Sequence, residues 1–218
     1  MVLMKNKRKL LFAAVSGLSS ALLIVLIRLA DVRPIGPEGT SVGLSHLNQF
    51  IFDRFGVNML WYEITDWLGV AAVLTAFLFT AAGAVQLIKR RSLLKVDRAI
   101  LALGGLYIIV IGLYVLFEIM VVNCRPVIMP GSTGPEASFP SSHTMLVCVI
   151  MGSAVMLIDR YITAKALGRA LKAICAGIIG VTVIGRSISG VHWFTDILGG
   201  ILISAALLAL FSEVINGE

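Results

Sequence analysis

The chain has 218 residues, of which 58% are hydrophobic and only 14% are charged, and its formal net charge is +6. So few charged side chains cannot cover a globule in water, which excludes an ordinary soluble domain and favours a protein that lies in a bilayer. The basic residues flank apolar runs, so we interpret the positive charge as a topology signal. We expect the lipid bilayer as a partner, and no nucleic acid.

Six apolar runs have the length needed to cross a hydrocarbon core, which takes about 20 helical residues. The first three are free of charged residues, and the last three each contain an ionisable residue near an end. The runs are Leu10–Ile27, Trp67–Ile88, Ala99–Phe117, Pro140–Ile158, Leu171–Gly190 and His192–Ser212. They predict an all-α integral membrane protein with six transmembrane helices, organised as a single domain over residues 1–218.

Lysine and arginine are unevenly distributed over the loops, and short loops rich in them stay in the cytoplasm. With the N-terminus inside, 13 of the 18 basic residues fall on the inner side, beginning with Lys5, Lys7, Arg8 and Lys9. We therefore expect a cytoplasmic-membrane protein with both termini in the cytoplasm. The basic start resembles a signal peptide, but the apolar run is long and no small-residue cleavage site follows, which predicts an uncleaved first span.

The longest segment between spans, residues 30–66, lies on the outer side. Apolar residues recur in it at helical spacing with polar residues between them, which predicts an amphipathic helix in the outer interface. The apolar residues are Leu44, Leu47, Ile51 and Phe55, and the polar ones are His46, Asn48, Gln49, Asp53 and Arg54. We interpret His46 as a surface residue and expect Trp61, Tyr62 and Trp67 at headgroup depth.

The three cysteines, Cys124, Cys148 and Cys175, show neither a pairing pattern nor metal-ligand spacing. We interpret them as small apolar side chains, buried where they fall inside spans, and we expect no metal and no cofactor.

Ionisable residues at the ends of the later spans all fall at the outer membrane face. They are Glu118 and Arg125 after the third span, His143 at the start of the fourth, Arg186 near the end of the fifth, and His192 and Asp196 at the start of the sixth. Taken singly, each could be a snorkelling or interfacial side chain. Ionisable groups in a membrane usually face a protein interior or a wet cavity, so their convergence predicts a functional site.

The residue types at this level suit phosphate chemistry. Two arginines can hold a phosphate through forked hydrogen bonds, and residues 140–144, PSSHT, place free backbone N–H groups at a helix start. His192 and Asp196 are four residues apart, so on one helix the carboxylate would reach and orient the imidazole. One histidine could then attack phosphorus while the other gives a proton, and the residues alone leave open which is which.

Three motifs in order, Arg125-Pro126, then Pro140 to His143, then Arg186 with His192 and Asp196, resemble the signature of the type-2 phosphatidic acid phosphatase family, also called lipid phosphate phosphatases. They lie within residues 118–126, 140–144 and 185–196. The resemblance implies a helical membrane phosphatase that needs no metal. We expect it to hydrolyse a lipid phosphate or pyrophosphate at the outer face.

The resemblance also implies a role for each matched residue. His192 would attack phosphorus to form a phosphohistidine, Asp196 would orient it, and His143 would protonate the leaving group and later help to activate water. The phosphoryl oxygens would be held by Arg125, Arg186, Ser141, and the backbone N–H groups of Ser142 and His143.

Three positions depart from the family pattern: Glu118 replaces Lys, Ser142 replaces Gly and Gly185 replaces Ser. The last two are mild, since Ser142 stays small and Gly185 removes only one hydroxyl. A carboxylate beside a phosphate is repulsive unless it is protonated, paired or contacting a cation. We expect Glu118 to pair with an arginine and orient it; recognition of an amine or bound cation, and a residue merely tolerated at the interface, are the alternatives.

Substrate and reaction type stay open at this level. Undecaprenyl pyrophosphate is favoured by analogy with such family members, with phosphatidylglycerol phosphate and phosphatidic acid as the other candidates. Two other functions are consistent with the residues. One is transfer of the phosphoryl group to another hydroxyl, and the other is non-catalytic binding or transport of a lipid phosphate.

Overall fold

The computed structural model describes residues 2–217, with side chains from residue 7 onward. Within that range the chain forms seven α-helices and no named strand. The predicted inner residue Lys5, and residues 1 and 218 of the predicted domain, lie outside the described side chains. The helices are α1 (Val2–Leu29), α2 (Ser45–Phe55), α3 (Met59–Arg90), α4 (Arg98–Ile119), α5 (Ser142–Tyr161), α6 (Lys165–Ser189) and α7 (Phe194–Asn216).

Six of these helices, all except α2, are long and apolar enough to cross a membrane, which confirms the predicted number of spans. Several predicted bounds are wrong. Helix α3 begins at Met59 rather than at Trp67, α6 begins at Lys165 rather than at Leu171, and α7 begins at Phe194 rather than at His192. Asn58 caps α3, because its side chain accepts a hydrogen bond from the Trp61 N–H at 3.3 Å. The early turns of α3 are polar enough to interrupt the apolar run, but they do not break the helix.

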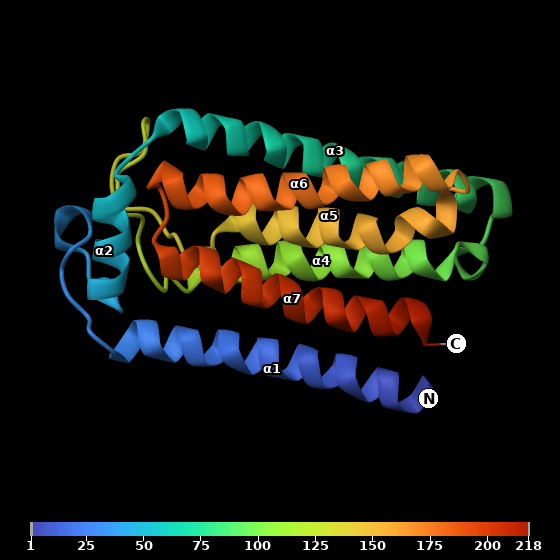
Figure 1. Cartoon of the computed structure of the whole chain (residues 1–218), viewed down its shortest axis with the longest axis horizontal. Coiled ribbons are helices and arrows are strands. Elements are labelled where there is room, and N and C mark those ends of the chain that lie inside the picture. The colour runs from blue at the N-terminus through green and yellow to red at the C-terminus, as the bar shows by residue number, and fades with distance from the viewer. Residues whose placement is uncertain (1, 218) are drawn as a thin grey trace.

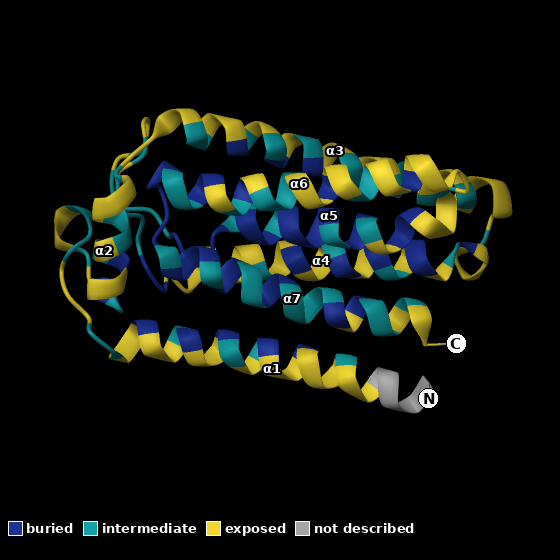
Figure 2. Cartoon of the chain, viewed as in Figure 1, coloured by how far each residue is buried: buried dark blue, intermediate teal, exposed yellow. Residues whose placement is uncertain are grey.

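Helix α5 is the central helix of the bundle, where it packs against α3, α4, α6 and α7 (Figure 1). It is largely buried, whereas α3 is largely exposed (Figure 2). One cluster of apolar side chains around Met145 and Val149 reaches α4 and α7, and a second around Met151 and Ala154 reaches α3 and α6. Helix α1 lies along α7 at the edge of the bundle.

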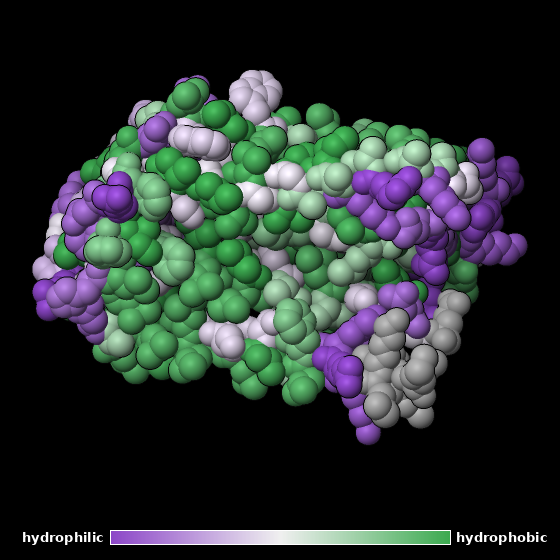
Figure 3. All heavy atoms as spheres, in the orientation of Figure 1, coloured by the Kyte–Doolittle hydropathy of each residue, from purple (hydrophilic) through white to green (hydrophobic). Residues whose placement is uncertain are grey.

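The surface between the two ends of the bundle is hydrophobic, and hydrophilic residues gather at the ends (Figure 3). Exposed leucine, isoleucine, valine and phenylalanine side chains cover the outward faces of the long helices. A monomeric soluble protein does not expose an apolar surface of this extent, and lipid-facing helices require one. The surface therefore fits the bilayer predicted from composition.

Helix α2 lies across the end of the bundle opposite the two termini, which confirms the predicted helix between the first and second spans (Figure 1). Its buried residues are Ser45 and Asn48, so the face toward the bundle carries polar side chains, whereas Leu47 and Phe55 are exposed. Asn48 is buried because its amide bonds to Gly43 and to Thr195 at the start of α7.

The remaining predictions of burial are largely confirmed. His46 is exposed, and its Nδ1 lies 2.8 Å from Oδ2 of Asp31. Cys148 and Cys175 are buried, and Cys124, in the loop after α4, is half-buried; all three are free.

Candidate active site

The bundle end that α2 crosses brings together the loop after α4, the start of α5 and the link between α6 and α7 (Figure 1). These are the three segments predicted to carry the site. The start of α3 joins them, which the sequence did not predict.

The link between α6 and α7 turns sharply and places His192 in the interior. Helix α6 ends at Ser189, and Gly190 follows with φ 66°, in the left-handed region. A Cβ on Gly190 would lie 2.0 Å from the carbonyl oxygen of Gly56, so only glycine fits here. Two residues later the His192 side chain is almost fully buried, directly before α7.

His192 and Asp196 therefore do not share a helix, and the prediction that both lie on one helical face is wrong. Asp196 is fully buried in the first turn of α7, where its Oδ2 accepts a hydrogen bond from the Trp193 N–H at 2.9 Å. The same Oδ2 lies 3.7 Å from Nδ1 of His192, within ion-pair range but too far for a hydrogen bond. This carboxylate and the backbone of Ser138, which also interacts with the His192 side chain, are the groups placed to orient the imidazole.

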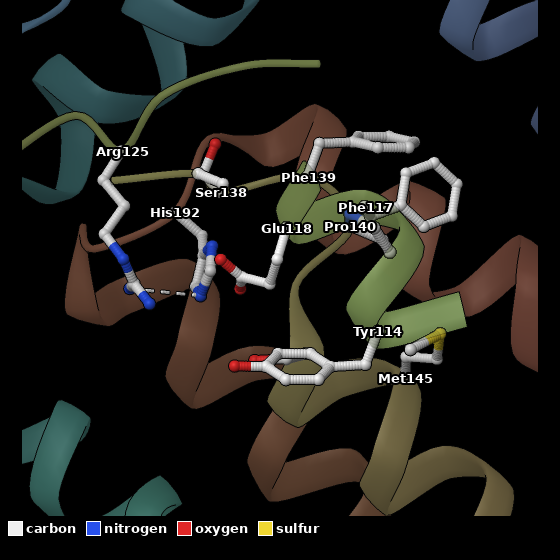
Figure 4. A pocket seen from close by; sticks show the side chains of 11 residues that line it. Tyr114, Phe117, Glu118, Arg125, Ser138, Phe139, Pro140, Met145 and His192 are labelled. Atoms are coloured by element: carbon white, nitrogen blue, oxygen red, sulfur yellow. Dashed lines mark hydrogen bonds between the residues drawn. The ribbon is translucent and has the colours of Figure 1, made fainter. Parts of the chain in front are cut away.

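Arg125 is held by the loop in which it lies. Its backbone N–H donates to the Glu136 carbonyl at 2.9 Å, and its Nε lies 3.1 Å from Oε2 of Glu136. Nη1 of Arg125 lies 3.5 Å from Nε2 of His192 (Figure 4). The carboxylate paired with Arg125 is thus Glu136, and the expectation that Glu118 pairs with an arginine is not met among the described ion pairs.

The surroundings of His192 keep its imidazole neutral. Burial lowers the pKa of His192 well below its usual value, and the positive charges of Arg125 and Arg186 lower it further. A neutral imidazole carries a lone pair on one ring nitrogen, which is the form that can attack phosphorus.

A small cavity lies in front of His192. Glu118, Arg125, Ser142 and His192 are among the residues that line it, together with Tyr114 (Figure 4). Glu118 comes from the last turn of α4 and lies one turn after Tyr114. Glu118 therefore does face the predicted site, although its role there stays a prediction.

The start of α5 has the form of an anion-binding helix end. Ser141 is the N-cap, and its buried Oγ accepts hydrogen bonds from the Thr144 N–H at 3.5 Å and the Thr144 hydroxyl at 3.0 Å. The N–H groups of Ser142 and His143 belong to the first helical turn and have no partner within the helix. Ser142 lines the cavity, whereas the Ser141 hydroxyl serves the helix, so phosphate binding by Ser141 stays a prediction.

His143 and Arg186 meet at a residue that sequence reasoning missed. Oδ1 of Asp66, in α3, lies 2.8 Å from Nε2 of His143 and 3.1 Å from Nη2 of Arg186. Arg186 is fully buried, and its guanidinium carbon lies 4.8 Å from the centre of the Tyr62 ring. The available signal was an acidic residue at the outer end of an apolar run, the same signal that identified Asp196.

The site therefore combines two arginines and two histidines with four carboxylates, of which Asp66 faces His143 and Asp196 faces His192. Within the described part of the chain, His, Cys, Asp and Glu side chains form no group of three or more that could hold a metal ion. The geometry suits an anionic ligand held between the arginines and the start of α5, next to a neutral imidazole.

Comparison with known proteins agrees with this geometry. A family model described as the PAP2 superfamily matches residues 99–217, more than half of the chain. Among solved structures, the chain is similar to "Crystal structure of the first transmembrane PAP2 type phosphatidylglycerolphosphate phosphatase from Bacillus subtilis", with a TM-score of 0.66 and 17% identity over 92% of this chain and 94% of that chain. No curated protein matches.

Proposed function

The chain belongs to the PAP2 superfamily, and on this premise we propose that it is an integral membrane phosphatase that hydrolyses a lipid phosphate or pyrophosphate. The observation that carries the proposal is the 3.5 Å approach of Arg125 Nη1 to Nε2 of the buried His192. A neutral nucleophile beside an anion-binding group is the arrangement that in-line transfer of a phosphoryl group requires.

The phosphoryl group binds in front of His192. Arg125 and Arg186 neutralise its charge, and the N–H groups of Ser142 and His143 donate to its oxygens. These donors are fixed before substrate arrives, so they stabilise the charge that moves onto the oxygens in the transition state without reorganisation.

The chemistry then takes two steps. Nε2 of His192 bonds to phosphorus as the bond from phosphorus to the leaving oxygen breaks, and the leaving oxygen takes a proton from His143. In the second step His143 accepts a proton from water as the water oxygen bonds to phosphorus. The phosphorus–nitrogen bond breaks, which releases phosphate and restores neutral His192. Asp196 orients His192 and balances the charge of the phosphohistidine.

The reaction takes place at the extracytoplasmic face. Both termini lie at the end of the bundle opposite α2 and the site (Figure 1). The excess of lysine and arginine in the loops at the terminal end supports a cytoplasmic location for that end. The phosphate-binding end then opens toward the outer headgroup region, where lipid phosphates of the outer leaflet can reach it.

Undecaprenyl pyrophosphate is the first candidate substrate, by analogy with what such family members do. Phosphatidylglycerol phosphate, the substrate class named for the structural relative, and phosphatidic acid are the other two. All three present a phosphoryl group at the membrane surface and a hydrocarbon tail in the bilayer, so the site chemistry is the same for each.

The test is phosphate release by purified protein in detergent, with chelator present, from each of these lipids and from a soluble phosphate ester. His192→Ala is the inactive variant, and His46→Ala is its matched control, because His46 lies at the same end of the protein but is exposed and is hydrogen-bonded to Asp31. Release that survives His46→Ala and disappears in His192→Ala supports the proposal. Release that requires added metal would contradict metal independence.

Two results would replace the proposal by another function. Phosphate that appears on an acceptor lipid, with little free phosphate, would indicate a phosphotransferase. Lipid-phosphate binding by folded protein, without any His192-dependent product, would indicate a binding or transport protein.

A further inference from the structure

Asp66 connects the site to a helix that lies outside the part of the chain matched by the family model, which begins at residue 99. A single oxygen of this residue, Oδ1, contacts both Nε2 of His143 at 2.8 Å and Nη2 of Arg186 at 3.1 Å. The two partners come from α5 and α6, so Asp66 is the point where three helices meet at the site.

Two other residues of α3, Gly69 and Tyr62, lie against the same two side chains. A Cβ on Gly69, three residues after Asp66, would lie 3.0 Å from Cδ2 of His143, so the imidazole rests against the helix where a side chain is missing. Tyr62, four residues before Asp66, places its ring 4.8 Å from the guanidinium carbon of Arg186. Both functional side chains are thus held from the same face of α3.

The unused nitrogens of Arg186 indicate where substrate would bind. Its Nε and Nη1 are buried and have no hydrogen-bond partner among the described residues, while Nη2 is held by Asp66. A guanidinium anchored at one corner in this way presents its other donors in a fixed direction. Those donors are available for the oxygens of a bound phosphoryl group.

We propose that Asp66 is a positioning residue that holds the proton donor His143 and the phosphate-binding Arg186 at a fixed spacing, as Asp196 does for His192. This inference rests on the proposed function. The step it serves is the first one: as His192 bonds to phosphorus, the leaving oxygen departs with its electron pair and takes the proton from His143. Asp66 acts through the imidazole and does not touch the reacting atoms.

A purely structural role for Asp66 would show itself differently. The Asp66 side chain is 47% exposed, but its partner Arg186 is fully buried, so removing the carboxylate leaves a buried guanidinium without its anionic partner and should lower the Tm. The Tm of each variant in detergent is therefore measured first, and kinetics are compared for folded protein, in which His143 and Arg186 have lost the group that fixes their orientation. The loss should appear in kinetics, and its size should depend on how much the leaving group needs a proton.

The experiment compares Asp66→Asn, Asp66→Glu and a matched control, Glu63→Gln, an exposed carboxylate one turn earlier on α3. The probes are phosphatidic acid, whose leaving alcohol must be protonated, and p-nitrophenyl phosphate, whose leaving phenolate needs no proton. For Asp66→Asn we expect kcat to fall about 10- to 100-fold with phosphatidic acid, by analogy with the loss of a carboxylate that orients a metal-bound histidine. With p-nitrophenyl phosphate kcat should stay within about 3-fold, and KM should rise for both probes because Arg186 is less well held.

The other variants test whether the effect of Asp66→Asn comes from the lost carboxylate acting through His143. Glu63→Gln should match the wild type with both probes, and Asp66→Glu should recover part of the lost kcat because a carboxylate is restored. Adding Asp66→Asn to His143→Gln should cost little further activity, since residues that act as one unit are not additive. Equal losses with both probes, no loss with either, or a full additional loss in the double variant would overturn the assignment of Asp66.

The wild type separates this inference from the function on which it rests. Wild-type protein that releases phosphate from neither probe, nor from undecaprenyl pyrophosphate or phosphatidylglycerol phosphate, would remove the proposed phosphatase activity, and the role of Asp66 with it. Wild-type activity that is unchanged in Asp66→Asn would leave the phosphatase in place and remove only the positioning role.

Discussion

Nη1 of Arg125 lies 3.5 Å from Nε2 of His192, so a permanent positive charge faces the nitrogen that is proposed to attack phosphorus. The same guanidinium is paired with Glu136 on its other side, at 3.1 Å. This charge opposes protonation of the imidazole, in the same direction as burial. In the proposed mechanism Arg125 would therefore serve two purposes, since it would bind the phosphoryl oxygens and also keep the nucleophile neutral.

The lowered pKa of His192 predicts the acid side of the pH profile. A histidine with the ordinary pKa of about 6.5 would lose half of its nucleophilic form at that pH. Because burial and the two arginines lower the pKa of His192, the protonated form accumulates only at more acidic pH. We expect kcat/KM to hold its plateau well below about pH 6.5, measured by phosphate release between about pH 4.5 and 8.

The variant Arg125→Gln tests whether the charge of Arg125 lowers the pKa of His192. Without the guanidinium the pKa of His192 should move up toward its ordinary value, so the acid limb should shift to higher pH while the plateau falls. Ionisation of the substrate phosphate is common to both proteins and cancels in the comparison. Superimposable acid limbs would show that Arg125 does not influence the protonation of His192.

Glu118 is expected to weaken the binding of a phosphate. It lines the same small cavity as Arg125 and His192, whereas the carboxylate that pairs with Arg125 is Glu136. A repulsion of about 1 kcal/mol between the carboxylate and a bound phosphate corresponds to a change of about 5-fold in KM. Glu118→Gln should therefore lower KM for phosphatidic acid about 5-fold, and Glu118→Lys should lower it further.

The neighbouring glutamate is the control for this prediction. Glu136→Gln removes the same charge but frees Arg125 from its ion pair, so its KM should rise. A substrate that carries an amine beside its phosphate should respond to Glu118→Gln in the opposite direction, with weaker binding. An unchanged KM for both substrates in Glu118→Gln would show that this side chain does not face the bound ligand.

The six membrane helices could be predicted because long uncharged runs are sufficient to identify them. The same criterion misplaced the start of α3, because Glu63 and Asp66 interrupt the apolar run. Hydropathy treats such residues as the end of a span, although here one of them contacts two site residues. The hydropathy criterion that identified the helix therefore excluded Asp66, the residue that connects α3 to the site.

Contacts across loops were beyond prediction for a different reason. The spacing of His192 and Asp196 indicated their approach, and they do approach to 3.7 Å, but through a turn before α7 rather than along a helix. The pairing of Arg125 with Glu136 depends on the loop folding back on itself, where the Arg125 N–H donates to the Glu136 carbonyl. No periodic pattern encodes such a fold, so the sequence does not predict the pairing of Arg125 with Glu136.

The packing around Gly185 leads to a prediction about stability that the resemblance to the family pattern does not suggest. Its replacement of a family serine was expected to be mild, but a Cβ here would lie 2.5 Å from Cγ2 of Thr65 and 2.9 Å from Cε3 of Trp61. Glycine lets α6 approach α3 closely beside Arg186 and Asp66. Restoring the serine in Gly185→Ser should push the helices apart and cost about 1–3 kcal/mol, seen as a lower Tm in detergent.

The activity of Gly185→Ser should fall as well, because separating α3 from α6 also lengthens the contact between Asp66 and Arg186. Gly180→Ser, one turn and a half earlier on α6, is the matched control, since a Cβ at Gly180 meets nothing within 4 Å. If Gly185→Ser kept the wild-type Tm and kcat, the close packing of α3 against α6 would be incorrect.

Asn48 is expected to hold α2 against the site. Its buried amide donates to the Gly43 carbonyl at 2.9 Å and to Oγ1 of Thr195 at 3.0 Å, and its oxygen accepts from the Thr195 N–H at 3.2 Å. Asn48→Ala would leave these buried groups without partners, at a cost of about 2 kcal/mol. For a chain of this size, that corresponds to a Tm lower by about 4–8 °C.

The effect of Asn48→Ala should extend to catalysis through Thr195, which stands directly before Asp196 in α7. Phe52 of α2 also packs against Trp193, with ring centres 5.6 Å apart, next to His192. A modest loss of kcat should therefore accompany the lower Tm. Gln49→Ala is the control, because the Gln49 amide bonds to Asp53 within α2 and its loss should leave both quantities unchanged. Equal effects of the two variants would mean that α2 is held in place by something other than the Asn48 amide.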